Sequence, residues 1–463
     1  MAESSIAPLA LIVAAFVCTA TLWSISPELA LLSFITLRPL IELGVYRQVA
    51  GLTLGQVWGA AFLVVVVGFL VTEGTSLGST TTRGVRIPGV LIALLAAYGV
   101  AALSRGPFGL AALMWLRLAA WVLSLVAAET IGRTARGQRR LLYTMGLFAA
   151  LLVLVVALLA ETGRYGSAYY SRPFGQAYVS LGQGPHGLAT DAVLALPMVL
   201  ILIWEGRHRL GAALLAGSLC ICVVLSFVRS AYAGLAVVLV VFIAVGVKAK
   251  NPWVRLSALG LTVAAACSVY LLWGTIQVRL GGLISAASGG PLDVQSTSGR
   301  LMFWQAILRY SLESPAHFLF GGGPATSYLV LVQRTGLSIW AHNDLLEMLA
   351  TGGIALALVY VLVVVWMLAS TLSLWRDRRQ SIAVRDFGII ATAAVTSFAG
   401  MSLLNGVAFS VSAIPLAVLL GLVRSMSRLP GQTALDVRRH TGAPESSKPL
   451  VSRSPEAGRD PIG

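Results

Sequence analysis

Two side chains suited to phosphate chemistry stand in the longest polar stretch of the chain, roughly residues 274–342. Arg300 lies within it and His342 at its end. A guanidinium binds phosphate oxygens through two parallel hydrogen bonds. An imidazole titrates near neutral pH and can accept a proton from a hydroxyl group. Long loops often carry function, so these residue types predict an anion site beside a catalytic base, and His342 is the candidate catalytic residue.

The residues after His342 predict how it is held. Asp344 and Glu347 have the spacing of a capping box, which predicts a helix that starts at Asp344. His342 then stands just ahead of this helix, with Asn343 and Asp344 fixing its position. Most isolated histidines are structural or merely exposed, which is the alternative for His342. His186 precedes another apolar segment in a similar way and is the next candidate.

Arg300 is predicted to begin an amphipathic helix, because Leu301, Trp304, Leu308 and Leu312 recur at helical spacing. The backbone N–H groups at a helix start favour anions. Arg300 therefore suits a phosphate group, and a solvated arginine at a helix end is the alternative.

A glycine run at 321–323 precedes Pro324 in the same polar stretch. Successive backbone N–H groups in such a loop can form a nest that binds phosphate. Gly322 and Gly323 are therefore candidate ligand contacts. The alternative is an ordinary turn, because Gly and Pro are the commonest turn residues.

Arg229 stands between two apolar segments, and the connection is too short for a free loop. Its side chain is expected at or just inside a membrane face. Long basic side chains often extend from such positions to the interface. An anionic partner, such as a lipid-linked phosphate at that depth, is the alternative.

The elements that position these residues are membrane helices. Hydrophobic residues make up 57% of the chain and charged residues 11%, with a mean hydropathy of +0.85. Lipid must therefore be the solvent. A membrane helix needs about 20 mostly apolar residues, and we expect about 12 crossings. The apolar segments are 6–23, 28–40, 52–71, 87–103, 108–131, 140–160, 186–204, 211–228, 232–247, 256–273, 345–368, 387–404 and 407–423.

Charge predicts the orientation of this bundle. Of the 33 Lys and Arg residues, 22 fall on one set of loops and ten on the other, with Arg117 inside a span. The basic side is expected to be cytoplasmic, which places 274–342 outside and the carboxyl terminus inside. The net charge of +15 is explained by this topology, and no nucleic-acid partner is predicted. The side of the amino terminus stays open, because 6–23 and 28–40 cross either twice or once together.

The chain is expected to hold one polytopic membrane domain, 1–428, that includes the outer loop 274–342. A disordered cytoplasmic tail, 429–463, is rich in Pro, Gly, Ser and charge. The 18 acidic residues include no Asp-x-Asp pair, and cation sites on a sugar diphosphate usually need close oxygen ligands. The four cysteines lie in apolar segments without zinc or disulfide spacing. No metal and no cofactor are predicted.

Several of these motifs together resemble the O-antigen ligase and polymerase family. The resemblance rests on Ser298-Gly299-Arg300 with Trp304, Phe320 to Pro324, His342-Asn343 with Leu349, Gly352 and Gly353, Ser226 to Ser230, and Gly184-Pro185-His186 ahead of Leu196-Pro197. Gly187 departs from the asparagine that this family has after Pro-His. The similarity covers about 180–365.

This resemblance implies an all-α integral membrane protein with a C-type-like glycosyltransferase fold and a large, partly helical outer loop. Such enzymes transfer a glycan from an undecaprenyl-pyrophosphate carrier to a sugar hydroxyl or lipid-linked acceptor, with inversion and without a metal, at the outer face of the bacterial cytoplasmic membrane. Arg229 and Arg300 would hold the pyrophosphate, and His342 would position or deprotonate the attacking hydroxyl. Gly322, Gly323, His186, Asn343 and Asp344 are candidate loop or acceptor contacts. Other proteins of a polysaccharide assembly pathway are candidate partners.

Two alternatives remain open on sequence grounds. A ligase and a polymerase differ in acceptor, and the motifs do not separate them, although we slightly favour a polymerase. A transporter or flippase of polysaccharide or lipid-linked glycan is the second alternative. Such a protein would be expected to carry charges near the bilayer midplane and paired broken helices, whereas the charges here are predicted to gather at the outer surface.

Overall fold

The described part of the chain is almost entirely helical, as predicted. The computed structural model describes residues 6–41, 48–49, 52–76, 87–104, 108–161, 184–205, 208–226, 228–248, 252–271, 273, 300–336, 341–406 and 413–428. The exception among them is a small antiparallel ribbon, β1 (Gln48–Val49) paired with β2 (Leu52–Thr53). This ribbon leads directly into a long helix.

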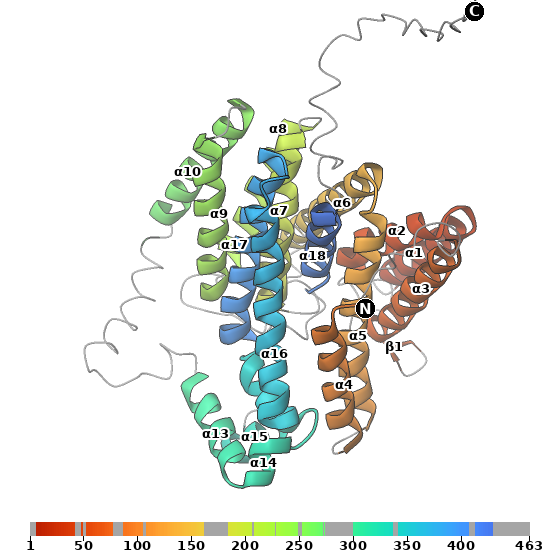
Figure 1. Cartoon of the computed structure of the whole chain (residues 1–463), viewed down its shortest axis with the longest axis vertical. Helices are drawn as coiled ribbons and strands as arrows, with labels where there is room; N and C mark the ends of the chain where they lie inside the picture. Colours follow the sequence, from red (N-terminus) through yellow and green to blue (C-terminus); the bar gives the residue numbers. More distant parts are fainter. Residues whose placement is uncertain are drawn as a thin grey trace, which may run out of the picture.

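Thirteen long helices correspond one to one with the apolar segments expected from the sequence (Figure 1). They are α1 (Ile6–Ile25), α2 (Pro27–Ile41), α3 (Leu54–Ser76), α4 (Gly89–Ser104), α5 (Phe108–Ile131), α6 (Ala135–Glu161), α7 (Gly184–Glu205), α8 (Arg209–Leu225), α9 (Arg229–Lys248), α10 (Pro252–Leu271), α16 (Asp344–Arg376), α17 (Ile382–Asn405) and α18 (Ala413–Arg428). Three short helices precede α16: α13 (Arg300–Leu312), α14 (Pro315–Phe320) and α15 (Thr326–Thr335).

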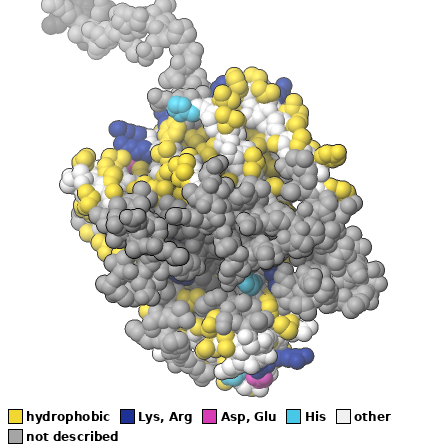
Figure 2. Space-filling view, turned by 180° about the vertical axis from the view of Figure 1, so that it is seen from behind, with side chains coloured by type: hydrophobic (Ala, Val, Ile, Leu, Met, Phe, Trp, Pro, Cys, Tyr) yellow, Lys and Arg dark blue, Asp and Glu magenta, His cyan; other side chains and the backbone are white. Residues whose placement is uncertain are grey.

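Several of these helices are suited to a bilayer. Within the described residues, six are long and apolar enough to cross a membrane: Gln56–Glu73, Met114–Ile131, Ala135–Leu158, Ser230–Lys248, Asp344–Arg376 and Ile382–Leu404. Figure 2 shows hydrophobic side chains over much of the described surface. The protein is therefore a multi-pass membrane protein, and the figure of about 12 crossings stays a prediction.

The amino end forms a helical hairpin. α1 and α2 are joined by Ser26 alone, and the hydroxyl oxygens of Thr19 and Ser33 approach to 3.4 Å. These residues lie equally far from Ser26 on its two sides, so the helices fold back on each other. The number of crossings that α1 and α2 make, and the side of the amino terminus, stay predictions.

One end of the bundle, the basic end, is held by ion pairs between helices. Buried Glu129 of α5 accepts from Arg424 of α18 at 2.6 Å and pairs with Arg428 at 2.8 Å. Arg140 of α6 pairs with Glu28 of α2 at 2.8 Å. The short helices α13, α14 and α15 lie at the opposite end (Figure 1), which we name the loop end.

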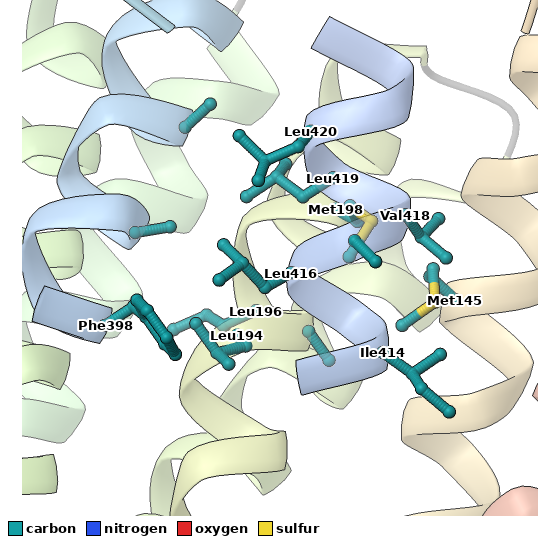
Figure 3. Close-up of a cluster of buried hydrophobic side chains, with 14 of the residues drawn as sticks. Met145, Leu194, Leu196, Met198, Phe398, Ile414, Leu416, Val418, Leu419 and Leu420 are labelled. Atoms are coloured by element: carbon teal, nitrogen blue, oxygen red, sulfur yellow. The ribbon is translucent and has the colours of Figure 1, made fainter. Parts of the chain in front are cut away.

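The core of the bundle surrounds α18. Figure 3 shows its apolar side chains interleaved with Leu194, Leu196 and Met198 of α7, Phe398 of α17 and Met145 of α6. All of these side chains are buried. Because α18 is in contact with α5, α7, α16 and α17, it fixes the frame on which the loop end is built.

A second, smaller core holds the loop end together. Phe303 and Ile307 of α13 pack with Leu331 of α15 and with Ala341 and Leu346 around the start of α16. α13 is a helix from Arg300, as predicted. The remaining parts of the expected loop, 274–299 and 337–340, and the expected tail, 429–463, lie outside the described residues.

Candidate functional site

His342 lies in a tight turn at the loop end, immediately before α16. The backbone of His342 is left-handed, with φ of 49°, a conformation that few residues other than glycine adopt. The side chain of Asn343 caps the helix by accepting from the Leu346 amide at 3.0 Å. The predicted helix start at Asp344 is confirmed, but Asn343 is the cap.

The end of α17 supports this turn from behind. Gly406 follows α17 with φ of 66°, where glycine is favoured. A Cβ atom there would lie 3.3 Å from the Asn343 amide nitrogen and 3.4 Å from the His342 Cα atom. Gly406 is not among the predicted site residues, although a glycine directly after an apolar helix is a common stop signal.

A hydrogen bond joins the helix of Arg300 to the turn of His342. The indole Nε1 of Trp304 donates to the carbonyl oxygen of Ala341 at 3.0 Å. Arg300 is half-buried at the start of α13, one turn or about 6 Å along the axis before Trp304. Two of the predicted site residues, Arg300 and His342, are thus held on neighbouring segments.

The three glycines at 321–323 are a docking element. Each of their amide N–H groups is already used, with Gly321 donating to His317 at 2.9 Å, Gly322 to Ala350 at 2.8 Å and Gly323 to Thr351 at 2.9 Å. The hypothesis of a phosphate nest is therefore wrong for these amides. Their role in the structure is to attach the loop to α16.

The loop docks where α16 is broken. Gly352 and Gly353 have non-helical backbone angles, and φ of Gly353 is 69°. A Cβ atom on Gly353 would lie 2.2 Å from the carbonyl oxygen of Leu319, so only glycine permits this approach. The apolar segment predicted at 345–368 is therefore not one straight crossing, because it contains this break.

A buried carboxylate connects α15 to the first part of α16. Glu347 accepts a hydrogen bond from the Ser327 hydroxyl, and both side chains are buried. The other carboxylate oxygen of Glu347, Oε1, has no hydrogen-bond partner among the described residues. A buried oxygen without a hydrogen bond lowers the stability of the fold. Glu347 is therefore an unfavourable polar group within the loop-end core.

The backbone of Arg229 starts α9, as the short connection predicts. Tyr232 closes the α8–α9 turn by donating to the Val224 carbonyl at 2.6 Å. α9 is then fastened to α17 by the Ser397 hydroxyl, which donates to the Gly234 carbonyl at 2.8 Å. The same helix that backs the His342 turn thus also holds α9. The Arg229 side chain lies outside the described residues, and its place in the site stays a prediction.

His186 lies in the first turn of α7, and its side chain is also outside the described residues. A separate groove of about 180 Å³ runs between α13 and α15, lined by Met302, Gln305, Ala306, Arg309, Arg334 and Thr335. It opens on a different face of α13 from Trp304 and includes none of the predicted site residues. Among the described residues, no cluster of His, Cys, Asp or Glu has the composition of a metal site, and the metal-independent reaction stays a prediction.

The helices and the polar residues at the loop end are those of a multi-pass membrane protein with a polar site at one end of its bundle. The family model described as O-antigen ligase matches residues 211–361. This match confirms the resemblance to the O-antigen ligase and polymerase family, and it includes Arg229, Arg300, the glycine run and His342. A comparison with curated proteins finds no match.

Proposed function

We propose that this protein transfers a glycan from an undecaprenyl-pyrophosphate carrier to a sugar hydroxyl, as a polymerase or ligase of surface polysaccharide. The observation that carries the proposal is the Trp304–Ala341 hydrogen bond, which holds the helix of Arg300 against the turn of His342. Both residues lie in the segment that matches the O-antigen ligase family. An anion-binding arginine and a base at one place suit a leaving diphosphate and an attacking hydroxyl.

The reaction assigned to these residues is a single displacement. The acceptor hydroxyl oxygen forms a bond to the anomeric carbon, and the bond from that carbon to the pyrophosphate oxygen breaks. His342 takes the hydroxyl proton as general base. Arg300 and Arg229 stabilise the negative charge that develops on the departing lipid diphosphate. Attack from the opposite side of the leaving group inverts the anomeric configuration.

The proposed orientation places the loop end outside the bacterial cytoplasmic membrane and the carboxyl terminus in the cytoplasm. Its support is the charge distribution, because the basic end carries Arg140, Arg379, Arg424 and Arg428 and basic loops are retained in the cytoplasm. The donor, whose glycan is presented on the outer face, then meets the site at the membrane surface.

The test is glycan profiling of a deletion strain, complemented with the parent gene or with the His342→Ala variant. A polymerase predicts that long chains disappear while single repeat units remain. A ligase predicts that long chains accumulate on the carrier. Restoration of the parent profile by His342→Ala, or a profile in which carrier-linked glycan accumulates on the inner face only, as for a flippase, contradicts the proposal.

A further inference from the structure

A buried carboxylate directly follows the His342 turn. The Asp344 side chain belongs to the first residue of α16 and is only 1% exposed. Placing a carboxylate in an apolar interior is unfavourable unless hydrogen bonds compensate for lost water. The structure supplies such a bond, because the Tyr360 hydroxyl donates to Oδ2 of Asp344 at 3.4 Å.

This contact shows how sharply α16 is bent. Asp344 and Tyr360 are sixteen residues apart, which corresponds to about 24 Å along a straight helix. Two side chains cannot bridge that distance. The segment 344–351 must therefore fold back at Gly352 and Gly353, which sets the His342 turn beside Tyr360 and not at the far tip of the helix.

Tyr360 also joins this folded segment to α17. Its hydroxyl oxygen lies 2.6 Å from the Ser402 hydroxyl oxygen, and both residues are buried. Since the phenol has one proton to donate, Ser402 donates to Tyr360 when Tyr360 donates to Asp344. The Ser402 carbonyl in turn accepts from the Gly406 amide at 3.3 Å, and Gly406 is the residue that backs His342.

We propose that Tyr360 is a positioning residue for the transfer reaction, which fixes the depth and orientation of the His342 turn through Asp344. The inference rests on the proposed function of His342. Buried hydrogen-bond chains of this kind specify one arrangement of the segments they join. Among the described residues, Glu347, in the next turn of α16, is a further titratable group that interacts with Asp344.

The test compares Tyr360→Phe with Thr371→Val, each purified as the full chain in lipid nanodiscs. Both changes remove one buried hydroxyl from α16, but within the described residues Thr371 donates to carbonyl groups of its own helix. We expect Tyr360→Phe to lower kcat at least about 10-fold, the effect of losing a hydrogen bond to a charged group. KM for the carrier-linked donor and the Thr371→Val rates should stay within about 2-fold of the parent. Ser402→Ala should lower kcat in the same direction.

A second measurement does not depend on transfer. Carbethoxylation of His342 by diethyl pyrocarbonate, followed by peptide mass spectrometry, reports how firmly the turn is held. The reaction should be at least about 3-fold faster in Tyr360→Phe and unchanged in Thr371→Val. Parental kcat in Tyr360→Phe, or equal His342 modification in all variants, overturns the positioning role. A parent protein that forms no glycosidic bond while Tyr360→Phe still exposes His342 overturns the proposed function alone.

Discussion

The indole nitrogen of Trp304 lies 3.0 Å from the carbonyl oxygen of Ala341, and this single contact ties two parts of the site that are 37 residues apart. Arg300 is one turn before the indole, and His342 is the residue after the carbonyl. This contact therefore holds the helix of Arg300 and the turn of His342 together at the loop end of the bundle.

Trp304→Phe keeps an aromatic ring and removes the indole N–H donor. The net contribution of a hydrogen bond is about 0.5–1.5 kcal/mol. We therefore expect the transfer rate to fall about 2- to 10-fold, with normal membrane yield. The initial rate in nanodiscs is the measurement. Trp253→Phe, on the exposed face of α10, is the matched control. Equal rates for the two variants would show that the contact does not align the site.

Replacing Arg229 or Arg300 by Lys keeps the charge and removes the planar fork. We expect each change to reduce transfer about 10- to 100-fold, because a hydrogen bond to a charged group contributes roughly 1.5–3 kcal/mol. Rates are compared at equal amounts of folded protein. Full activity in both variants would favour arginines that only extend to the membrane interface.

His342→Ala should abolish transfer without lowering membrane yield, and His342→Gln should keep a trace of activity. General base assistance contributes about 10²- to 10⁴-fold. A loss below about 10-fold would point to a packing role. In that event His186 is the next residue to test, with the same assay.

Gly353→Ala should destabilise the loop end. The Gly353 backbone, with φ of 69° and ψ of −166°, is a conformation that costs alanine about 1–3 kcal/mol, and the added methyl group would meet the Leu319 carbonyl. A lower thermal midpoint and reduced yield are expected. Gly217→Ala is the control, because a Cβ atom there meets nothing within 4 Å and alanine favours a helix. Equal stability of the two variants would contradict the tight docking of the loop on α16.

Reporter fusions check the orientation. Fusions after Arg140, Arg209, Arg255 and Arg379 should read cytoplasmic, and an insertion near Gly289 should read external. An internal reading at Gly289 would place the proposed site on the wrong side of the membrane for an outer-face transfer.

The helices were predictable because burial in lipid demands long apolar segments, and each such segment is helical in the structure apart from the break in α16. The helix that starts at Arg300 and the helix that follows His342 were predictable from helix signals, such as the Leu-Trp-Leu spacing after Arg300. These signals are local, so they needed no knowledge of distant contacts.

The misjudged features all depend on partners far away in sequence. The amides of Gly322 and Gly323 donate to carbonyl groups of α16, which no local pattern reveals. Gly352 and Gly353 sit in an apolar run that reads as a continuous span. Tyr360 resembles an ordinary core residue until the fold brings it to Asp344.

Because α16 folds back at Gly352 and Gly353, contacts within the protein fix the position of His342 along the bundle axis. The position of the turn is fixed relative to α17 through Ser402 and Gly406. The diphosphate of a lipid carrier lies instead at a depth that the bilayer surface sets. Lipids with shorter or longer acyl chains shift that surface relative to the helices. Membrane thickness would therefore be a variable of the proposed reaction, because it would set how closely the diphosphate approaches His342.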